Sequence, residues 1–93
     1  MDEMRTTPHL SARSDTDPHK LAGAIAGHLR EVGWVEIQVM GAAAVNQAVK
    51  GVAVASSYLK AEGASLVCVP AFADIRVNGE HRTAIRLRVT MAS

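Results

Sequence analysis

Cysteine is almost absent from this chain of 93 residues, and long hydrophobic runs are absent altogether. The one cysteine, Cys68, excludes a disulfide within the chain and is typical of a reducing compartment, so we expect a cytoplasmic protein. No apolar run reaches membrane-spanning length, and the N-terminal residues lack the hydrophobic region of a signal peptide. We therefore expect no contact with a membrane.

Aromatic residues and net charge are also low. Trp34, Tyr58 and Phe72 are the only aromatics, and their scattered positions predict packed side chains rather than a platform on which bases stack. The formal net charge is +1, so any attraction to nucleic acid must come from a local patch of cations. These two features argue against an RNA-recognition module of the aromatic-platform kind.

Residue combinations typical of enzymes are missing as well. Cys68 lies in the apolar run LVCVP, which predicts a buried, inert thiol. The segment GAAAVNQAVK lacks the GK[ST] ending of a phosphate-binding loop. No metal-ligand spacing relates the histidines to Cys68 or to a carboxylate; they are His9, His19, His28 and His81. We expect no enzymatic activity, no metal and no cofactor.

What the chain does contain is a globular composition, with 48% hydrophobic and 20% charged residues. Its length allows one modest core, rich in alanine and valine, rather than two. We predict that residues 1–7 form a flexible N-terminal segment and that residues 8–90 form a single domain.

The first half of the domain predicts a strand, a helix and a second strand. Residues 8–13 form a short strand at a sheet edge, where Pro8 is tolerated. Asp17 and Pro18 give the signal for a helix start, and Gly33 gives the signal for its end. The apolar residues between them fall on one face: Leu21, Ile25, Leu29 and Val32.

The next segment, 34–40, alternates between apolar and polar residues, which predicts a strand buried on one side. A second helix follows over about 43–62 and ends at Gly63. Its predicted buried residues are Val45, Val49, Val52 and Leu59.

Residues 66–77 and 80–90 predict a terminal hairpin. Asn78-Gly79 is typical of a two-residue turn, but that turn would place Ile75 on the same face as Arg82. We therefore predict a three-residue loop, 77–79, with Gly79 in a bulge. This register sets two charge pairs across the strands, Asp74 with Arg82 and Arg76 with Glu80.

The element order β-α-β-α-β-β predicts an α+β two-layer sandwich, with both helices on the apolar face of the sheet. Three glycines lie within the predicted helices: Gly23, Gly27 and Gly51. Each weakens a helix by roughly 1 kcal/mol relative to alanine, so we predict that they allow the two helices to approach closely.

Two groups of residues suggest a site for phosphate. Asn46, Gln47 and Lys50 stand close to the start of the second helix, where free N–H groups and the helix dipole attract anions. Four arginines are predicted to share the polar face of the hairpin: Arg76, Arg82, Arg86 and Arg88. An ordinary solvated face, partly neutralised by Asp74 and Glu80, explains these arginines equally well.

Three segments carry a family resemblance: LAGAIAGHLRE, EIQVMGAAAVNQAVKGVAVA and LVCVPAFADIRVNGEHRTAIRLRV. Together they resemble the stage V sporulation protein S family over about residues 10–89. That family is similar in fold to the Alba chromatin proteins. The resemblance implies a four-stranded mixed sheet, in the order 1-2-4-3, with two helices on one face.

The resemblance also implies a small regulatory protein in sporulation or a related developmental programme. It implies a homodimer or higher oligomer that binds DNA or RNA without sequence preference. By position, the implied nucleic-acid-binding residues are Gly41, Asn46, Gln47, Lys50, Arg76, Asn78, Arg82 and Arg86. An alternative from the residues themselves is a module that binds a protein or a small anionic metabolite instead of nucleic acid.

Overall fold

The computed structural model describes residues 7–92 of the chain. Apart from Thr7, the predicted flexible segment 1–7 lies outside the described residues. The elements are β1 (His9–Ala12), α1 (Pro18–Val32), β2 (Trp34–Val39), α2 (Ala42–Lys60), β3 (Leu66–Val77) and β4 (Glu80–Met91). Neither helix in residues 7–92 is both long and apolar enough to span a lipid bilayer.

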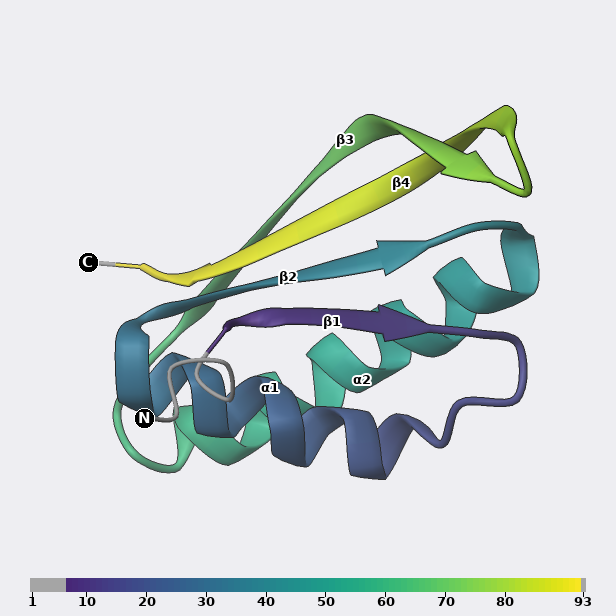
Figure 1. Ribbon diagram of the computed structural model, residues 1–93. Coiled ribbons are helices and arrows are strands. Elements are labelled where there is room, and N and C mark those ends of the chain that lie inside the picture. The colour runs from purple at the N-terminus through teal and green to yellow at the C-terminus, as the bar shows by residue number, and fades with distance from the viewer. Residues whose placement is uncertain (1–6, 93) are drawn as a thin grey trace.

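The sheet has the strand order β1-β2-β4-β3, with both helices on one face (Figure 1). β1 runs parallel to β2, whereas β4 runs antiparallel to both of its neighbours, β2 and β3. These pairings confirm the predicted mixed sheet and the α+β two-layer fold. They also confirm that β1 is an edge strand, and they make β3 the opposite edge.

Helix α1 begins and ends where its capping residues predict. The Asp17 carboxylate accepts a hydrogen bond of 2.9 Å from the backbone N–H of His19, and Pro18 occupies the first helical position. At the other end, Gly33 has φ 87° and its N–H donates to the Leu29 carbonyl at 3.0 Å. Local side-chain chemistry therefore sets both ends of this helix.

The core lies between the helices and the two central strands. Val35 of β2 is opposite Val89 of β4, and Ile37 is opposite Leu87. All four side chains point toward the helices and are buried, as the alternation in β2 predicts. Leu29 of α1 covers them from the helix layer.

Of the residues predicted to be buried in helix α2, Leu59 is confirmed, whereas the three valines are not fully buried. Its valines lie at the margin of the core or in solvent, and Val49 is 51% exposed. Val32 of α1, also predicted to be buried, is exposed too. The buried face of α2 consists of smaller residues: Ala44, Ala48, Gly51, Ala55 and Leu59. Small side chains at the contact let the two helices approach closely. The stabilisation from this close packing outweighs what burying the larger valine side chains would contribute.

Of the three glycines predicted to bring the helices together, Gly51 alone does so. A Cβ atom at Gly51 would lie 2.8 Å from Cδ2 of Leu21 in α1. Gly23 and Gly27 are exposed, and a Cβ atom at either position would meet nothing within 4 Å. The prediction was wrong for these two because α1 contacts the row of small residues on α2, Ala44, Ala48, Gly51 and Ala55, through its leucine side chains and not through its glycines.

The hairpin between β3 and β4 has a two-residue turn, so the predicted three-residue loop is wrong. Val77 is opposite Glu80, and the turn residues Asn78 and Gly79 have φ 50° and 81°. Positive φ at both positions is typical of the type I′ turn, whose twist matches that of the strands. The predicted charge pairs are lost in this register, because Arg82 lies opposite Ile75.

The first half of β3 is exposed on both faces, which corrects two further predictions. Cys68, predicted to be buried, is exposed, and Phe72, predicted to be packed, is 83% exposed. Tyr58 of α2 is exposed as well. Partial desolvation still raises the pKa of the Cys68 thiol, so the thiolate is disfavoured at neutral pH.

An ion pair joins the last turn of α1 to the segment that follows α2. Arg30 of α1 donates two hydrogen bonds to the carboxylate of Glu62, at 3.2 and 2.6 Å. These hydrogen bonds lower the pKa of Glu62, so the pair stabilises the fold above the ordinary carboxyl pKa of roughly 4.3. The stabilisation is lost as the pH falls through the lowered pKa.

Glu62→Gln is therefore expected to lower the midpoint of urea unfolding at pH 7, with the difference from the unmodified chain closing below about pH 4. Glu31→Gln is the matched control, since Glu31 is exposed and has no ion pair within residues 7–92. A difference at Glu62 that persists unchanged at low pH would show that the ion pair is not its cause.

Candidate functional site

A hollow lies where β1 and β2 end. Because the two strands are parallel and Ala12 is opposite Val39, the segments that follow them leave the sheet at the same edge. The hollow between these segments has a volume of about 580 Å³. Its polar lining comes from both segments and the strand ends: Ser11, Arg13, Ser14, Gln38 and the backbone of Gly41. We call it the β1–β2 hollow.

The N-terminus of α2 forms one wall of the β1–β2 hollow. Gly41 is the N-cap residue, with φ 91°, and its carbonyl accepts a hydrogen bond of 3.1 Å from Val45. No side chain caps this end, and the first turn carries no acidic residue. The first N–H groups of a helix have no partner within it and carry partial positive charge. This wall of the hollow is therefore suited to an anion.

The three polar residues predicted near the start of α2 lie farther along it. Asn46 and Gln47 are in the second turn, and Lys50 is in the third, about 12 Å along the axis from Ala42. The Gln47 side chain donates a hydrogen bond of 2.9 Å to the Thr16 carbonyl. Gln47 thus holds the segment after β1 against α2, and none of the three lines the β1–β2 hollow.

A second, shallower hollow of about 270 Å³ lies on the face of the sheet away from the helices, here called the outer face. It is lined by His9, Leu10, Ser11, Glu36, Gln38 and Arg86. Ser11 and Gln38 line both hollows, so the two adjoin. The structure therefore joins two of the predicted residues, Gly41 and Arg86, in one surface.

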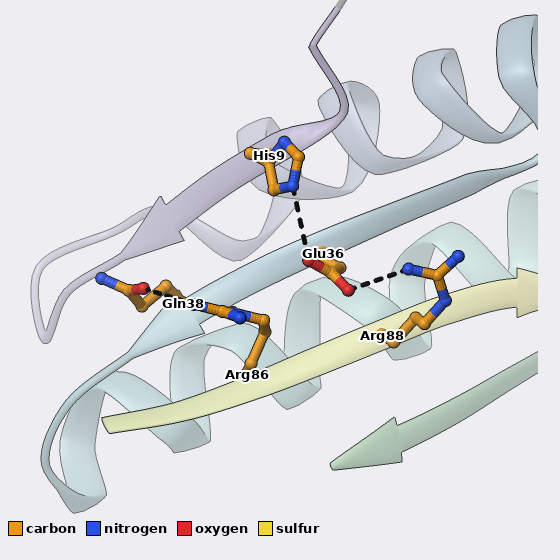
Figure 2. Close-up of polar contacts among 5 residues, drawn as sticks. All are labelled: His9, Glu36, Gln38, Arg86 and Arg88. Carbon is orange, nitrogen blue, oxygen red and sulfur yellow. Dashed lines mark hydrogen bonds and ion pairs between the residues drawn. The ribbon is translucent and has the colours of Figure 1, made fainter. Parts of the chain in front are cut away.

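Charges on the outer face are arranged in a network (Figure 2). Arg88 donates a hydrogen bond of 2.8 Å to Glu36, whose other carboxylate oxygen lies 3.4 Å from Nε2 of His9. Arg86 instead approaches the neutral Gln38 side chain, at 3.4 Å. Within residues 7–92, Arg86 has no ion pair, so its charge remains available to an anion.

Trp34 belongs to the same face. The Arg88 guanidinium lies 4.4 Å from the centre of its ring, and the His9 ring meets its edge. The strand alternation could have placed Trp34 here, because it shares its side of β2 with Glu36 and Gln38. The indole is half-buried beneath these neighbours rather than packed in the core.

The predicted face of four arginines is divided between the two sides of the sheet. Arg82 lies on the outer face with Arg86 and Arg88, and it is 3.7 Å from Glu80. Arg76 points to the helix side, 3.1 Å from His81. The two-residue turn causes this division, because changing the loop by one residue moves every β3 side chain to the other face. Asn78, in the turn, lies at the far end of the hairpin.

Sequence reasoning missed Arg13, Ser11 and Ser14 in the β1–β2 hollow. The signal was available, because ligands commonly bind where parallel strands of one sheet end beside each other. Arg13 lies 3.7 Å from Asp15, and both side chains are exposed. Within residues 7–92, no group of three or more His, Cys, Asp or Glu side chains is arranged to hold a metal ion.

The region that matches a known protein family coincides with the folded domain. The family model described as stage V sporulation protein S matches residues 9–92, from the first residue of β1 to the residue after β4. The match therefore covers both hollows and the whole hairpin.

Proposed function

Because the chain belongs to the stage V sporulation protein S family and is thus a small sporulation-related protein, we propose that it binds the phosphate backbone of nucleic acid. In this proposal it acts as a non-enzymatic regulator and as an oligomer. Its partner is DNA or RNA, bound without sequence preference.

The adjacency of the two hollows is the observation that supports this proposal most. It puts the uncapped start of α2, the side chain of Arg13 and the unpaired charge of Arg86 along one surface. A helix N-terminus and arginine side chains are both common ligands of backbone phosphates. Successive phosphates of one strand can therefore bind along the surface from the hollow to the outer face.

The chemistry of the lining favours binding over catalysis. Ser11, Ser14 and Gln38 supply hydroxyl and amide groups, which donate hydrogen bonds to phosphate oxygens. Glu36 is the acidic residue nearest Arg86 in the second hollow, and its charge is already neutralised by Arg88. A polyanion approaching Arg86 thus meets little repulsion from this carboxylate.

The proposal also includes predicted binding residues that lie outside the two hollows: Asn46, Lys50, Arg76, Asn78 and Arg82. Lys50 is exposed on α2, and Arg76 and Asn78 are exposed near the end of the hairpin. In an oligomer each of these groups is repeated, so a long nucleic acid would meet several of them at once. Such outlying contacts add affinity but no sequence preference.

The proposal is tested by fluorescence anisotropy of labelled duplex DNA, single-stranded DNA and RNA. Raising the salt from about 50 to about 200 mM is expected to weaken binding at least about tenfold, because phosphate contacts release condensed counterions. Scrambling the nucleotide sequence is expected to leave the affinity unchanged. A chain that binds none of the three probes at the lower salt would contradict the proposed function.

The size of the β1–β2 hollow favours one alternative, a small anionic metabolite. Its volume of about 580 Å³ lies within the range of roughly 300–1,000 Å³ that is usual for small-molecule sites. Under this alternative, inorganic phosphate or a nucleotide stabilises the chain against heat, while none of the three nucleic-acid probes binds.

A further inference from the structure

Glu36 lies at the centre of the charge network on the outer face, between His9 and Arg88 of the neighbouring strands (Figure 2). One of its carboxylate oxygens accepts the hydrogen bond of 2.8 Å from Arg88, and the other lies 3.4 Å from Nε2 of His9. Only 18% of the Glu36 side chain is exposed, so water screens these contacts less than it screens an ion pair in open solvent. The carboxylate therefore controls the charge that this part of the surface presents.

The charge of His9 is the variable part of the network. An imidazole side chain gains its proton in the pH range around neutrality, whereas carboxylate and guanidinium groups keep their charges there. Within residues 7–92, the charged groups that face His9 are Glu36 from β2 and the arginines at positions 86 and 88 from β4. Protonation of His9 thus adds a positive charge beside one carboxylate and a pair of guanidinium groups.

Protonated His9 and Arg88 compete for the Glu36 carboxylate. The two cations repel each other, and a single negative charge is shared between them, so closer pairing with His9 weakens the hold of Glu36 on Arg88. Arg88 has another contact that does not need the carboxylate, since its guanidinium lies 4.4 Å from the centre of the Trp34 ring. The side chain can therefore stay against the indole while its N–H groups turn to a different anion.

Arg86 is the neighbour with which a released Arg88 would bind that anion. The two arginines are two residues apart on the same side of β4, so their Cα atoms are roughly 7 Å apart. Arg86 has no ion pair within residues 7–92 and approaches the neutral Gln38 side chain. Two guanidinium groups at this spacing can both donate hydrogen bonds to one phosphate.

The state of His9 also decides what a phosphate meets beside it. When a phosphate takes Arg88 from Glu36, a neutral His9 leaves the carboxylate without a cationic partner, and the carboxylate repels the phosphate. A protonated His9 keeps the carboxylate neutralised, because Nε2 already lies next to the free oxygen of Glu36. Transfer of Arg88 to a phosphate is thus favoured by the proton on His9.

We propose that Arg88 is a phosphate-binding residue that Glu36 withholds and that protonation of His9 releases. Nucleic-acid binding and protonation of His9 then favour each other, since such coupling is reciprocal. The inference rests on the proposed function, because it names how the affinity of that same surface is regulated. The affinity for nucleic acid accordingly rises as the pH falls.

The first test is anisotropy of the preferred nucleic acid at constant low salt, at about pH 8 and at about pH 6. The unmodified chain is expected to bind about fivefold more tightly at the lower pH, near the lower end of the usual range of coupling between two sites. His9→Gln is expected to reduce this change to less than about twofold, the part that comes from the general field of the molecule. His19→Gln is the matched control, since His19 is exposed in the first turn of α1, and it should keep the full change.

Glu36→Gln separates the release of Arg88 from a direct contact between His9 and phosphate. Glutamine keeps the shape of the side chain but not the charge that holds Arg88. The variant should therefore bind at the higher pH about as tightly as the unmodified chain does at the lower pH, with little remaining pH dependence. A variant that is folded by circular dichroism and keeps the full pH dependence would overturn the inference, because His9 would then act on the phosphate itself.

A measurement on the chain alone separates this inference from the proposed function. Heteronuclear NMR of the Arg88 guanidinium, assigned with Arg88→Lys, reports whether its terminal nitrogens are held or rotate freely. We expect slow rotation at the higher pH and faster rotation at the lower pH, with slow rotation at both in His9→Gln. Equal rotation at the two pH values in the unmodified chain would overturn the inference.

The two readouts together give distinct outcomes for the two proposals. Release of Arg88 at the lower pH in a chain that binds no nucleic acid would keep the coupling of His9 to Arg88 and reject the proposed function. Nucleic-acid binding of the same affinity at both pH values would keep the proposed function and reject this inference.

Discussion

Reversing two charges, in the double variant Arg13→Glu/Arg86→Glu, is expected to weaken nucleic-acid binding about 100-fold or more at about 50 mM salt. Arg13 lines the β1–β2 hollow and Arg86 lines the adjoining hollow on the outer face. The substitutions remove two phosphate contacts from each copy and place a carboxylate where each phosphate would bind. Anisotropy with the preferred nucleic acid measures the loss.

The matched control for this variant is Lys20→Glu/Lys60→Glu, which changes the net charge by the same amount. Lys20 is in the first turn of α1 and Lys60 is in the last turn of α2, and neither lines a hollow. We expect the control to lose less than about tenfold, through the general field of the molecule alone. Equal losses in the two double variants would mean that the hollows are not the binding surface.

Replacing Gly51 with leucine is expected to destabilise the fold by about 3 kcal/mol, near the upper end for overpacked cores. The Cβ atom alone would lie 2.8 Å from Cδ2, 3.1 Å from Cγ and 3.3 Å from Cβ of Leu21. A change of rotamer moves Cδ2 and Cγ of Leu21 but leaves its Cβ in place, and it makes no room for the rest of a leucine side chain at position 51. The two helices must separate instead, which opens the core between α1 and α2.

Gly27→Leu is the control for the substitution at Gly51. Gly27 is exposed in α1, and a Cβ atom there meets nothing within 4 Å. Leucine at this position is expected to raise stability by about 0.5–1 kcal/mol, because it favours the helix more than glycine does. Denaturant unfolding followed by circular dichroism gives both values. Similar effects at the two glycines would contradict the proposed close contact at Gly51.

Features that depend on neighbouring residues could be predicted from the sequence. Asp17, Pro18 and Gly33 define the ends of α1 through hydrogen bonds within a few residues, so their positions were correct. The buried side of β2 follows from simple alternation and was also correct. The strand order came from the family resemblance rather than from the residues, because the pairing of distant strands leaves little trace in local pattern.

Features that depend on tertiary geometry could not be predicted. The turn at Asn78 and Gly79 was rejected because both faces of β3 were assumed to be sorted into apolar and polar sides. That assumption fails where β3 overhangs the helices, since both of its faces are then exposed. Arg76 was assigned to the wrong face for the same reason.

The candidate site also combines features that local sequence predicts with features that only the tertiary structure shows. Gly41 and Arg86 were identified by position, but the joining of their surroundings required the parallel pairing of β1 and β2. Arg13 was not predicted, because its position in the β1–β2 hollow depends on where the segment after β1 lies. Gln47 was predicted to bind phosphate, but it lines neither hollow, and its side chain donates a hydrogen bond to the Thr16 carbonyl. Its hydrogen bond fixes one segment against another, and no sequence pattern indicates that.

The alanine row of α2 determines how this protein can change over evolutionary time. Most cores lose stability when a large side chain is truncated, but Ala44, Ala48 and Ala55 have almost nothing to truncate. In the contact between α1 and α2, the substitutions expected to destabilise the fold are those that add side-chain volume. Accepted changes here should therefore be restricted to alanine, glycine and serine, while the outward valines of the same helix vary more freely. Sequence drift in α2 is thus expected to follow the period of the helix, with the smallest residues changing least.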